Sequence, residues 1–560
     1  MSDFAGLRLA LSSLMAQRRG VETAAQNVAN ANTPGYSRQR VDLQSQGAPA
    51  VPALWSVFKG SSAGVRVAAL ERFRNQFLEI QAGLEHGSMA QLAQGASTMR
   101  NLEGIFPEPS DAGIARRLTD FWTAFDDVAN HPDDTAARTQ LLERASTLTA
   151  SINAASDDLT RARYDTITEL QSTVTEINAL ASSIASLNRA IKSNQIAGIS
   201  ANELMDQRDL LVTQLAEASG GAVRSGEYGQ VNVVISGTAI VSGEEVRSLM
   251  VDSAGPVALR WVADSSLAAV TSGKVAGQLE AVNATIPGYV AQLDAMATAL
   301  RDDVNSLHGS VGGSLAVASQ NQGAAGNLEF ELALDGGAYA TVTVAGADWS
   351  GPGGAAALGA ALQAAVDAAI GAGNATVGAS GGNGAALAVS LAPTATHTVL
   401  VRASGTNAGF ATLLGTTAVG SDGVGGRAFF SGSGAGDLEV ASGVAGTPAA
   451  IAAGVASAGP LDGSRALDIA DLAGSTGGAD ALYRQMIVQL GVGTQTAATR
   501  EEIQQRAVES LDNARQAESG VSLDEEMTNL VQFQHAYDAA ARFLAAIDEM
   551  LDTLINRTAV

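Results

Sequence analysis

The sequence predicts an α+β multidomain protein with α-helical coiled-coil segments at both ends. Between these ends it predicts an elongated helical domain with a small β portion, and an inserted β-rich outer domain. Three observations support this prediction. Both termini show heptad spacing of apolar residues, residues 134–195 form a helical pattern without Pro or Gly, and the composition turns to Gly, Ala, Ser, Thr and Val near Gly309. A chain of 560 residues is also too long for one core.

The first helical pattern begins near Phe4 and has the three-four spacing of a coiled-coil seam, interrupted only by Arg18. An ordinary amphipathic helix is the alternative. A helix that pairs with a second coiled-coil helix is favoured, because the sequence before Pro34 offers no other helix for it to pack against. The seam residues expected to form an assembly interface are Leu7, Leu11, Leu14, Val21 and Val28, accompanied by Phe4 and Ala25.

A turn is predicted to end this helix. Pro34 disfavours the α conformation at Thr33, and Gly35 can adopt the positive φ that a turn needs. The expected turn or hinge consists of Asn32, Thr33, Pro34, Gly35 and Tyr36. Residues 37–68 then alternate apolar and polar side chains, which predicts an extended arm.

The middle of the chain is predicted to be mainly helical. A helix over 70–106 has one apolar side made of Phe73, Phe77, Ile80, Leu84 and Leu92. Pro287 is expected to kink or split a later helix. The remaining predicted elements are helices at 114–129, 134–195, 202–218 (opened by a capping box at Ser200–Glu203) and 272–307, and β structure at 223–262. The long helix would span roughly 90 Å, which is typical of an architectural rod.

The stretch 315–455 is interpreted as an inserted β-rich domain with one helix, and low-complexity disorder is the alternative. Phe330, Leu332 and Leu334 precede the Asp335-Gly336-Gly337 turn of a hairpin whose second strand holds Tyr339, Thr341 and Thr343. An Ala-rich helix is expected at 355–370. Further strands are expected around Leu387 and Val389, and around Val399 and Val401.

The chain closes on two more helices. The first covers 480–516, where Gly491 and Gly493 are expected to loosen the middle. A second capping box at Ser522–Glu525 opens the last helix, whose heptad spacing is the most regular in the chain. The seam residues expected to form the second half of the assembly interface are Leu530, Phe533, Tyr537, Leu544, Ile547, Leu551 and Leu554, with Ala540 between them.

These elements give five segments along the chain. The predicted boundaries are 1–68 for the N-terminal coiled-coil helix and arm, 69–314 for the helical domain with its β part at 223–262, 315–455 for the outer insert, 456–518 for the return of the helical domain, and 519–560 for the C-terminal coiled-coil helix. The two ends must meet in space, since otherwise each seam is exposed to water.

Composition excludes several function classes. A net charge of −24 argues against binding nucleic acid, which requires clustered Lys and Arg. The absence of cysteine excludes disulfides and thiolate metal sites. No apolar run is long enough for membrane insertion, and residues 1–30 lack the continuous apolar region of a cleaved signal peptide.

No catalytic, cofactor-binding or metal-binding site is predicted. The five histidines form no ligand-spaced pair. The G-x-S-x-G matches at Gly60–Gly64 and Gly378–Gly382 do not follow an apolar strand and open a helix, as a nucleophile elbow requires. Adjacent acidic residues, such as Asp157 and Asp158, point in different directions on a helix. They are therefore interpreted as solvent-facing residues and not as a pair for acid–base catalysis. The protein is therefore predicted not to be an enzyme.

Both termini resemble the flagellar rod, hook and hook-associated axial proteins. The resemblance lies in residues 27–36, which read Asn-Val-Ala-Asn-Ala-Asn-Thr-Pro-Gly-Tyr, and in residues 523–527, 532–537 and 548–552. Ser37-Arg38-Gln39 and Leu204–Asp209 favour the hook-associated members of the family over its rod and hook proteins. The resemblance covers about 1–310 and 470–560. Within the insert, Phe330–Val389 is faintly similar to a small β-α-β module of flagellins and filament-cap proteins.

The resemblance implies a structural adaptor that joins hook to filament and assembles through its terminal helices after export. The partners it implies are further copies of this chain in a ring-like homo-oligomer, the hook protein, a second hook-associated protein on the filament side, and an export chaperone on the C-terminal helix. It places the protein in the extracellular flagellum, secreted by type III export without a cleaved signal peptide. Two alternatives stay open, namely a hook or rod subunit, and an adhesin or surface activity carried by 315–455.

Overall fold

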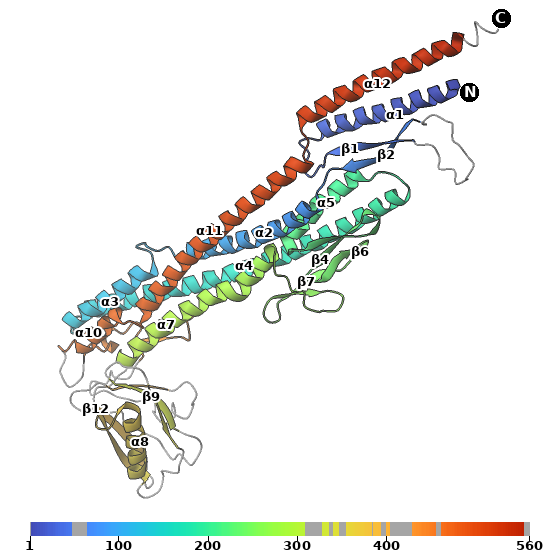
Figure 1. The fold of residues 1–560 in the computed structure, drawn as a ribbon. Helices are drawn as coiled ribbons and strands as arrows, with labels where there is room; N and C mark the ends of the chain where they lie inside the picture. The colour runs from blue at the N-terminus through green and yellow to red at the C-terminus, as the bar shows by residue number, and fades with distance from the viewer. Residues whose placement is uncertain are drawn as a thin grey trace. The chain divides into compact units, whose positions relative to one another are not determined.

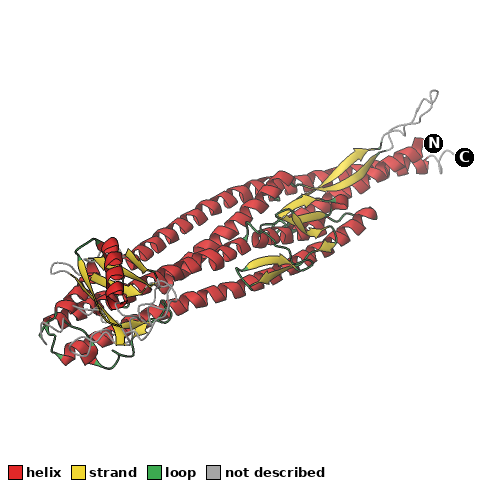
Figure 2. Ribbon diagram, turned by 90° about the horizontal axis from the view of Figure 1, so that it is seen from below, coloured by secondary structure: helices red, strands yellow, loops and turns green. Residues whose placement is uncertain are grey.

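The computed structural model describes residues 2–46, 64–308, 328–334, 340–345, 354–382, 385–393, 399–403, 428–454 and 461–553. The chain divides into two compact units. Unit 1 is Met1–Arg100, Arg163–Thr285 and Thr494–Val560, and unit 2 is Asn101–Ala162 and Ile286–Gly493. Long helices and small antiparallel sheets make up both units, which confirms the α+β class (Figures 1 and 2). The five segment boundaries stay a prediction.

Unit 1 is built mainly from helices, some of which continue beyond it. Its helices are α1 (Ser2–Ala29), α2 (Gln76–Ile105) as far as Arg100, α4 (Thr135–Ile196) from Arg163, α5 (Asn202–Ser219), α6 (Lys274–Glu280), α11 (Ala479–Ser519) from Thr494, and α12 (Leu523–Asp552). The predicted long helix is confirmed as α4. Gly491 and Gly493 do not interrupt α11, so the expected loosening there is wrong.

The extended arm forms an antiparallel hairpin of β1 (Gln39–Ser45) and β2 (Val65–Arg72). The prediction of a helix from residue 70 is wrong, because β2 continues to Arg72 and α2 begins at Gln76. Asn75 determines this start. Its Oδ1 accepts a hydrogen bond from the amide of Phe77 at 3.0 Å, which satisfies a donor that the first helical turn leaves open.

The predicted β portion at 223–262 is confirmed as two small sheets packed on α4. The core lies where α4 packs against the two sheets. It contains Leu170, Ile177 and Ile184 of α4 together with Val233 and Trp261. One sheet has the order β3-β4-β5-β6, and the other pairs β7 with β8. The strands are β3 (Ala222–Ser225), β4 (Val231–Ile235), β5 (Thr238–Ser242), β6 (Glu245–Val246), β7 (Leu249–Asp252) and β8 (Ala258–Trp261).

The first predicted capping box is wrong. The residue before α5 is Ala201, and no side chain caps the helix there. Asn202 instead turns its side chain to the hairpin, where Nδ2 donates to the backbone oxygen of Leu70 at 3.1 Å and to Gln39 Oε1 at 3.0 Å. Tertiary hydrogen bonds to the hairpin therefore replace the local cap, and they fix α5 to the arm.

Within unit 1, polar contacts connect α2 to α11. His86 lies between two carboxylates, with Nδ1 3.0 Å from Glu217 of α5 and Nε2 3.2 Å from Asp512 of α11. The other contacts are Asn75–Glu518, Glu79–Arg515, Glu85–Gln504 and Arg100–Glu501. Since the residue numbers rise on α2 as they fall on α11, the two helices run antiparallel.

Unit 2 is organised around a cluster of aromatic rings. Phe121 and Phe125 of α3 (Ile114–Asn130) contact Phe429 and Phe430, and all four side chains are fully buried. The other elements are the remainder of α2, α4 and α11, α7 (Ile286–His308), α10 (Ser464–Ala470), β14 (Phe430–Ser431) and β15 (Glu439–Val440). Pro287 is the second residue of α7 and follows a π-helical turn at Ala281–Thr285, which confirms the predicted split.

Side chains near the end of α7 bind backbone groups of residues 429, 430 and 452, which belong to the same unit. Asn305 Oδ1 accepts from the amides of Phe429 and Phe430 at 2.7 and 2.9 Å, and His308 Nε2 accepts from the amide of Ala452 at 3.0 Å. The end of α7 is thereby held to residues near the end of the predicted insert, 315–455.

Within the insert, the structure confirms the helix α8 (Gly354–Ile370) and the hairpin of β9 (Leu328–Leu334) and β10 (Ala340–Val344). The turn at 335–337 lies outside the described residues. The strands β12 (Ala385–Pro393) and β13 (Val399–Ala403) are also confirmed, whereas β11 (Ala375–Gly382) was not predicted. Gly378–Gly382 lies within β11, and Gly60–Ala63 lies outside the described residues.

The contacts of His86 predict a pH dependence of unit 1. Both ring nitrogens face carboxylates, and only the imidazolium can donate to both. The hydrogen bond to Glu217, followed by Asp512, raises the pKa of His86 above its usual value against the effect of burial. This contribution to stability is complete below an unfolded-state pKa of about 6.5 and is lost as the pH rises through the raised folded-state pKa.

Thermal unfolding between about pH 6 and pH 9 should therefore show a stability loss that His86→Gln largely removes. His131→Gln is the matched control, because His131 is exposed and pairs only within α3 and its C-terminal end. An identical pH profile for wild type and His86→Gln would contradict this reading of the site.

Candidate functional site

The two chain ends lie side by side as an antiparallel pair, α1 with α12 (Figure 1). Gly6 lies against Ile547, Gly20 against Phe533, and Asn27 against Glu526. The expectation that the ends meet is confirmed, and they meet within one chain. Each helix therefore gains a partner before any second copy is present.

The side of α1 that faces α12 is made of small residues. Ala10, Ala16 and Ala24 are buried, and a Cβ at Gly20 would lie 2.6 Å from the Phe533 ring. Such a distance lies inside van der Waals contact, so the two helices approach as closely as they do because position 20 has no side chain. The pattern of large aliphatic residues along α1 did not reveal this face.

The large residues predicted as the α1 seam lie elsewhere on the helix. Leu7, Leu14, Val21 and Val28 are half-buried, and Leu11 is 47% exposed. At about 100° per residue, this row lies roughly 120° around the helix from the face that meets α12. Its role as an assembly interface stays a prediction.

The predicted α12 seam does face α1. Ala540 and Ile547 are buried, Leu530, Phe533, Leu544 and Leu551 are half-buried, and Tyr537 is 38% exposed. Leu554 lies outside the described residues. Regular heptad spacing thus located the inner side of α12, because its large side chains pack over the small residues of α1. Whether the same residues contact other subunits stays a prediction.

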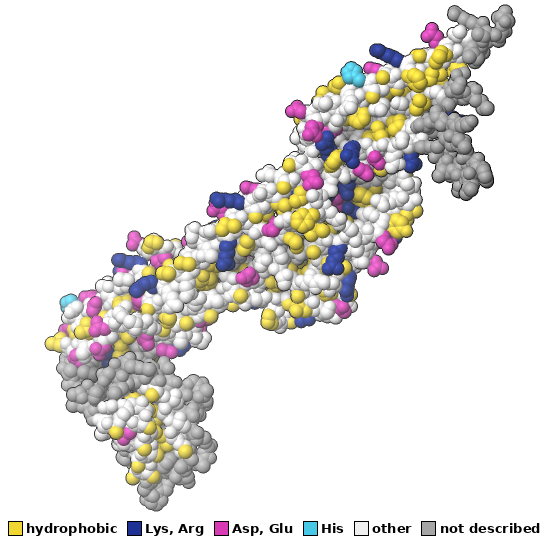
Figure 3. Space-filling model, viewed as in Figure 1, with side chains coloured by type: hydrophobic (Ala, Val, Ile, Leu, Met, Phe, Trp, Pro, Cys, Tyr) yellow, Lys and Arg dark blue, Asp and Glu magenta, His cyan; other side chains and the backbone are white. Residues whose placement is uncertain are grey.

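A second row runs along the outer side of α12. Its members have three-four spacing and no charge, although the helix as a whole is strongly acidic. Phe543 and Met550 are 45% and 60% exposed. We call this the outer row, consisting of Gln532, Ala536, Ala539, Phe543, Ala546 and Met550. Figure 3 shows hydrophobic side chains at the surface of the terminal pair.

The base of the pair is fixed by one buried amide. Asn27 is 1% exposed, and its Nδ2 donates to Glu526 at 3.0 Å and to the backbone oxygen of Gln39 at 2.9 Å. Its Oδ1 accepts from the hydroxyl of Tyr36 at 2.7 Å and from the amide of Gln39 at 3.0 Å. All four hydrogen-bonding positions are used, so one side chain holds α1, the turn, the arm and α12 together.

Glu526 completes this base as a buried carboxylate. Its Oε1 accepts from Arg38 Nε at 2.7 Å, and its side chain is 3% exposed. Arg38 also pairs with the exposed Glu525, and its backbone amide donates to the oxygen of Ser519 at 3.0 Å. These contacts attach the first turn of α12 to Arg38, which lies just after the turn that ends α1.

The predicted turn residues take the expected backbone path. α1 ends at Ala29, and Gly35 has a φ of 78° beside Leu210 of α5. Asn32, Thr33 and Pro34 are exposed, and Tyr36 points back to Asn27. Burial, together with the nearby Asp206, Glu203 and Glu526, raises the pKa of Tyr36, which keeps its hydroxyl protonated as a donor. A hinge role for these residues stays a prediction.

The residues that fix the base were not selected from the sequence. Asn27, Arg38 and Glu526 had appeared only as parts of the terminal motifs. A polar residue repeated at an inward heptad position is the signal that could have found Asn27 and Glu526.

In the parts of the chain that the structure describes, no group of His, Asp or Glu could hold a metal ion. None of the helices described is both long and apolar enough to cross a membrane.

Removing the charge of Glu526 should loosen the terminal pair. Glu526→Gln leaves Arg38 next to an uncharged, buried partner, which we expect to cost about 3 kcal/mol. Glu525→Gln is the matched control. Its side chain is 62% exposed, so its loss should cost less than about 1 kcal/mol. Hydrogen exchange of amides in α1 and α12 measures both changes, and equal exchange in the two variants would argue against the buried pair.

Two glycine substitutions should shift stability in opposite directions. Alanine normally stabilises a helix interior by about 1 kcal/mol relative to glycine. Gly95→Ala should show this gain, because no atom lies within 4 Å of the added Cβ. Gly20→Ala should instead lose stability, because the Phe533 ring must move away. Urea unfolding followed by helical circular dichroism and hydrogen exchange compares them, and a stabilised Gly20→Ala chain would rule out the close approach.

Three family models match the chain in positions that correspond to these elements. The helical domain of flagellar hook-associated protein FlgK matches residues 99–313. The flagella basal body rod protein model matches residues 7–36, which contain most of α1 and the turn. The C-terminal model of the flagellar basal body rod FlgEFG proteins matches residues 514–557, which contain α12.

Relatives named flagellar hook-associated protein 1 align over nearly the whole chain. The protein of Bacillus subtilis (strain 168) is 28% identical over 99% of this chain and 98% of its own length. The protein of Escherichia coli (strain K12) is 27% identical over 98% of each chain. A solved structure of the flagellar hook junction protein FlgK from Burkholderia pseudomallei covers 79% of this chain and 100% of its own, at 20% identity and a TM-score of 0.48. The family models and the full-length relatives together show that this chain is similar to flagellar hook-associated protein 1 over nearly its whole length.

Proposed function

We propose that this chain is the structural adaptor that joins the flagellar hook to the filament. The observation that carries the proposal is the paired termini. Family models of axial proteins match both ends, and the same two ends form one helical pair held by a buried polar base. The full-length relatives are hook-associated proteins, so a rod or hook subunit is not favoured.

Assembly would use the sides of the terminal pair that the chain itself leaves open. The seam row of α1 and the outer row of α12 point away from the contact within the pair. Each helix therefore has one side that is used within the pair and a second, uncharged row with three-four spacing that is half-buried or exposed. A helix with two such rows can contact two neighbours, which suits a closed ring of alternating α1 and α12 helices.

The proposed place between hook and filament implies the following partners. Further copies would form the ring-like homo-oligomer, the hook protein would lie on one side, and a second hook-associated protein would lie on the filament side. An export chaperone would cover the exposed rows of the C-terminal helix before assembly. The protein would reach the extracellular flagellum without cleavage of a signal peptide.

The adaptor acts by shape and contact, and we propose no catalytic activity for it. The described elements are long helices and small sheets. The buried Asn27 and Asn188 and the half-buried Asn305 bind backbone atoms that hold elements together. The insert would extend outward from this frame.

A deletion strain tests the adaptor function. Loss of the gene should leave complete hooks and remove filaments, and the intact chain should restore both filaments and motility. Immuno-electron microscopy should place the label in one band between hook and filament. Loss of the hooks themselves would point to a rod or hook subunit instead.

In the same strain, removal of residues 523–560 should abolish assembly while the central elements stay folded. A finer change is Phe543→Glu, which puts a charge into the outer row at a side chain that is already exposed. It should prevent filament formation without unfolding the monomer. Gln534→Glu adds the same charge at an exposed position outside the outer row and should assemble normally. Filaments formed by the truncated chain would refute assembly through α12.

A further inference from the structure

The part of α11 that belongs to unit 1 is held there mainly by polar contacts. The structure describes all of residues 494–519, and Val508 is the only one of them with a buried side chain. By contrast, α4 buries Leu170, Ile177 and Ile184 in the core of the same unit. Segments with few buried apolar contacts open at a lower free energy than the core around them. We call residues 494–519 the strap.

One arginine is the main polar anchor of the strap on α2. Arg515 Nε and Nη2 donate to the two carboxylate oxygens of Glu79, at 3.1 and 2.8 Å. Such a bidentate pair is among the stronger side-chain contacts in proteins. The pair of Arg100 with Glu501 is a weaker contact, because the Arg100 side chain is 50% exposed.

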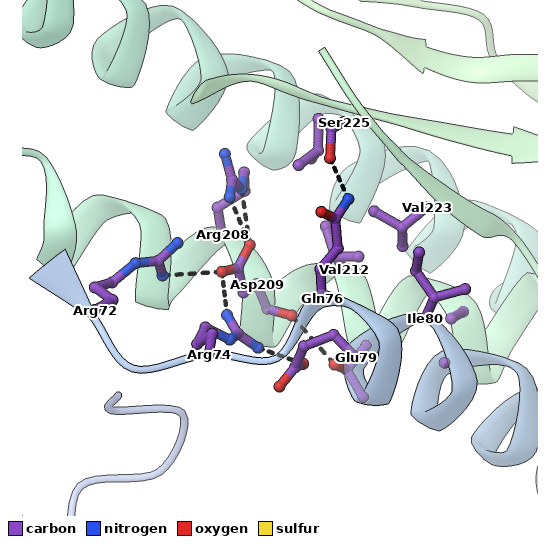
Figure 4. A pocket seen from close by; sticks show the side chains of 14 residues that line it. Arg72, Arg74, Gln76, Glu79, Ile80, Arg208, Asp209, Val212, Val223 and Ser225 are labelled. Carbon is purple, nitrogen blue, oxygen red and sulfur yellow. Dashed lines mark hydrogen bonds and ion pairs between the residues drawn. The ribbon is translucent and has the colours of Figure 1, made fainter. Parts of the chain in front are cut away.

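The anchor is the last member of a longer series of ion pairs, of which Figure 4 shows the part from Arg72 to Glu79. Acidic and basic side chains alternate along it, and each interior member contacts a partner on both sides. We call this the ion-pair series. In order of contact, it consists of Asp206, Arg72, Asp209, Arg74, Glu79 and Arg515.

Solvent screens these charges little. The side chains of the series are between 8% and 22% exposed. Against the effect of burial, Arg74, Arg208 and Arg72 lower the pKa of Asp209, so its carboxylate stays ionised at neutral pH. Removing one charge from such a series leaves its neighbour without full compensation. A change at one member therefore affects the next.

A pocket of about 200 Å³ lies beside the series and gives its side chains room to move. Arg72, Arg74, Glu79 and Asp209 all line this pocket. In a close-packed interior, a side chain cannot change its conformation without displacing neighbours. Ion pairs next to a pocket can separate and form again, which suits a contact with two states.

The other end of the series reaches the turn that follows α1. Asp206 Oδ2 accepts a hydrogen bond from the backbone amide of Ser37 at 3.3 Å. Ser37 is buried and directly follows Tyr36, whose hydroxyl donates to Asn27 at the base of the terminal pair. The series thus runs from the turn, through α5 and the residues between β2 and α2, to the strap.

We propose that the docking of the strap on α2 is coupled to the turn through the ion-pair series. With the turn ordered, Asp206 keeps the series in place, and Glu79 presents its carboxylate to Arg515. An open strap would loosen the turn by the same amount, because coupling between two sites is reciprocal. In the ring of the proposed adaptor function, contacts that order the terminal pair would close the strap, and only this consequence rests on that function.

Hydrogen exchange of the purified full-length chain tests the coupling. Asp206→Asn removes a charge at the end of the series that contacts the turn. Amides of the strap should then exchange about threefold to tenfold faster, while those of residues 170–191 in α4 keep their protection. Arg515→Gln separates the strap from the series, so in that background Asp206→Asn should have little further effect on the strap.

Arg100→Gln is the matched control, because Arg100 binds Glu501 of the strap and lies outside the series. Asp206→Asn should keep its full effect in that background. If Asp206→Asn lowers protection throughout unit 1, Arg74→Gln takes its place as a change within the series.

Two results would overturn the coupling. One is a strap whose exchange stays unchanged in the series variant, and the other is an effect of the same size with and without Arg515. Either result leaves the adaptor function untouched, because the experiment uses the free chain. That function fails separately, if deletion of the gene removes the hooks themselves.

Discussion

The structure of the terminal region depends on one buried polar contact, Asn27 to Glu526. A buried carboxylate is costly without partners, and here Asn27 and Arg38 both donate to it. Asn27 also binds Tyr36 and Gln39, so one side chain joins the turn and the arm to α12. A sequence separation of 499 residues is thereby closed by an interaction that neither end can satisfy alone. The apolar face would tolerate sliding by a turn, whereas this contact sets one register.

The rest of the pair follows from that register. With Asn27 opposite Glu526, Gly20 meets Phe533 and Gly6 meets Ile547, so large residues of α12 lie over small ones of α1. Using small residues for the inner contact leaves the large aliphatic side chains of α1 on its outer side. Folding of the pair thus leaves these side chains half-buried or exposed, where they are available for the proposed contacts with other copies.

Much of this fold could be predicted from the sequence, and the failures have physical reasons. Periodicity over many turns located α4 and the inner side of α12, and Pro34 and Gly35 located the end of α1. Periodicity did not identify the face of α1 that packs against α12, because heptad patterns are recognised by large residues and this face has small ones such as Gly20 and Ala24. It misplaced the start of α2, where Asn75 caps the helix, and it predicted a side-chain cap for α5, where Asn202 instead binds the backbone of Leu70. Contacts between distant residues, such as Asn27 and Glu526, have no local signal.

The closed base of the insert has a consequence for how this family varies. Because Asn305 binds Phe429 and Phe430, the distance that the chain between these positions must bridge does not depend on the length of that chain. Closing a longer loop between fixed ends costs only about 0.6 kcal/mol for each doubling of length. Selection can therefore lengthen, shorten or exchange this outer module at little thermodynamic expense.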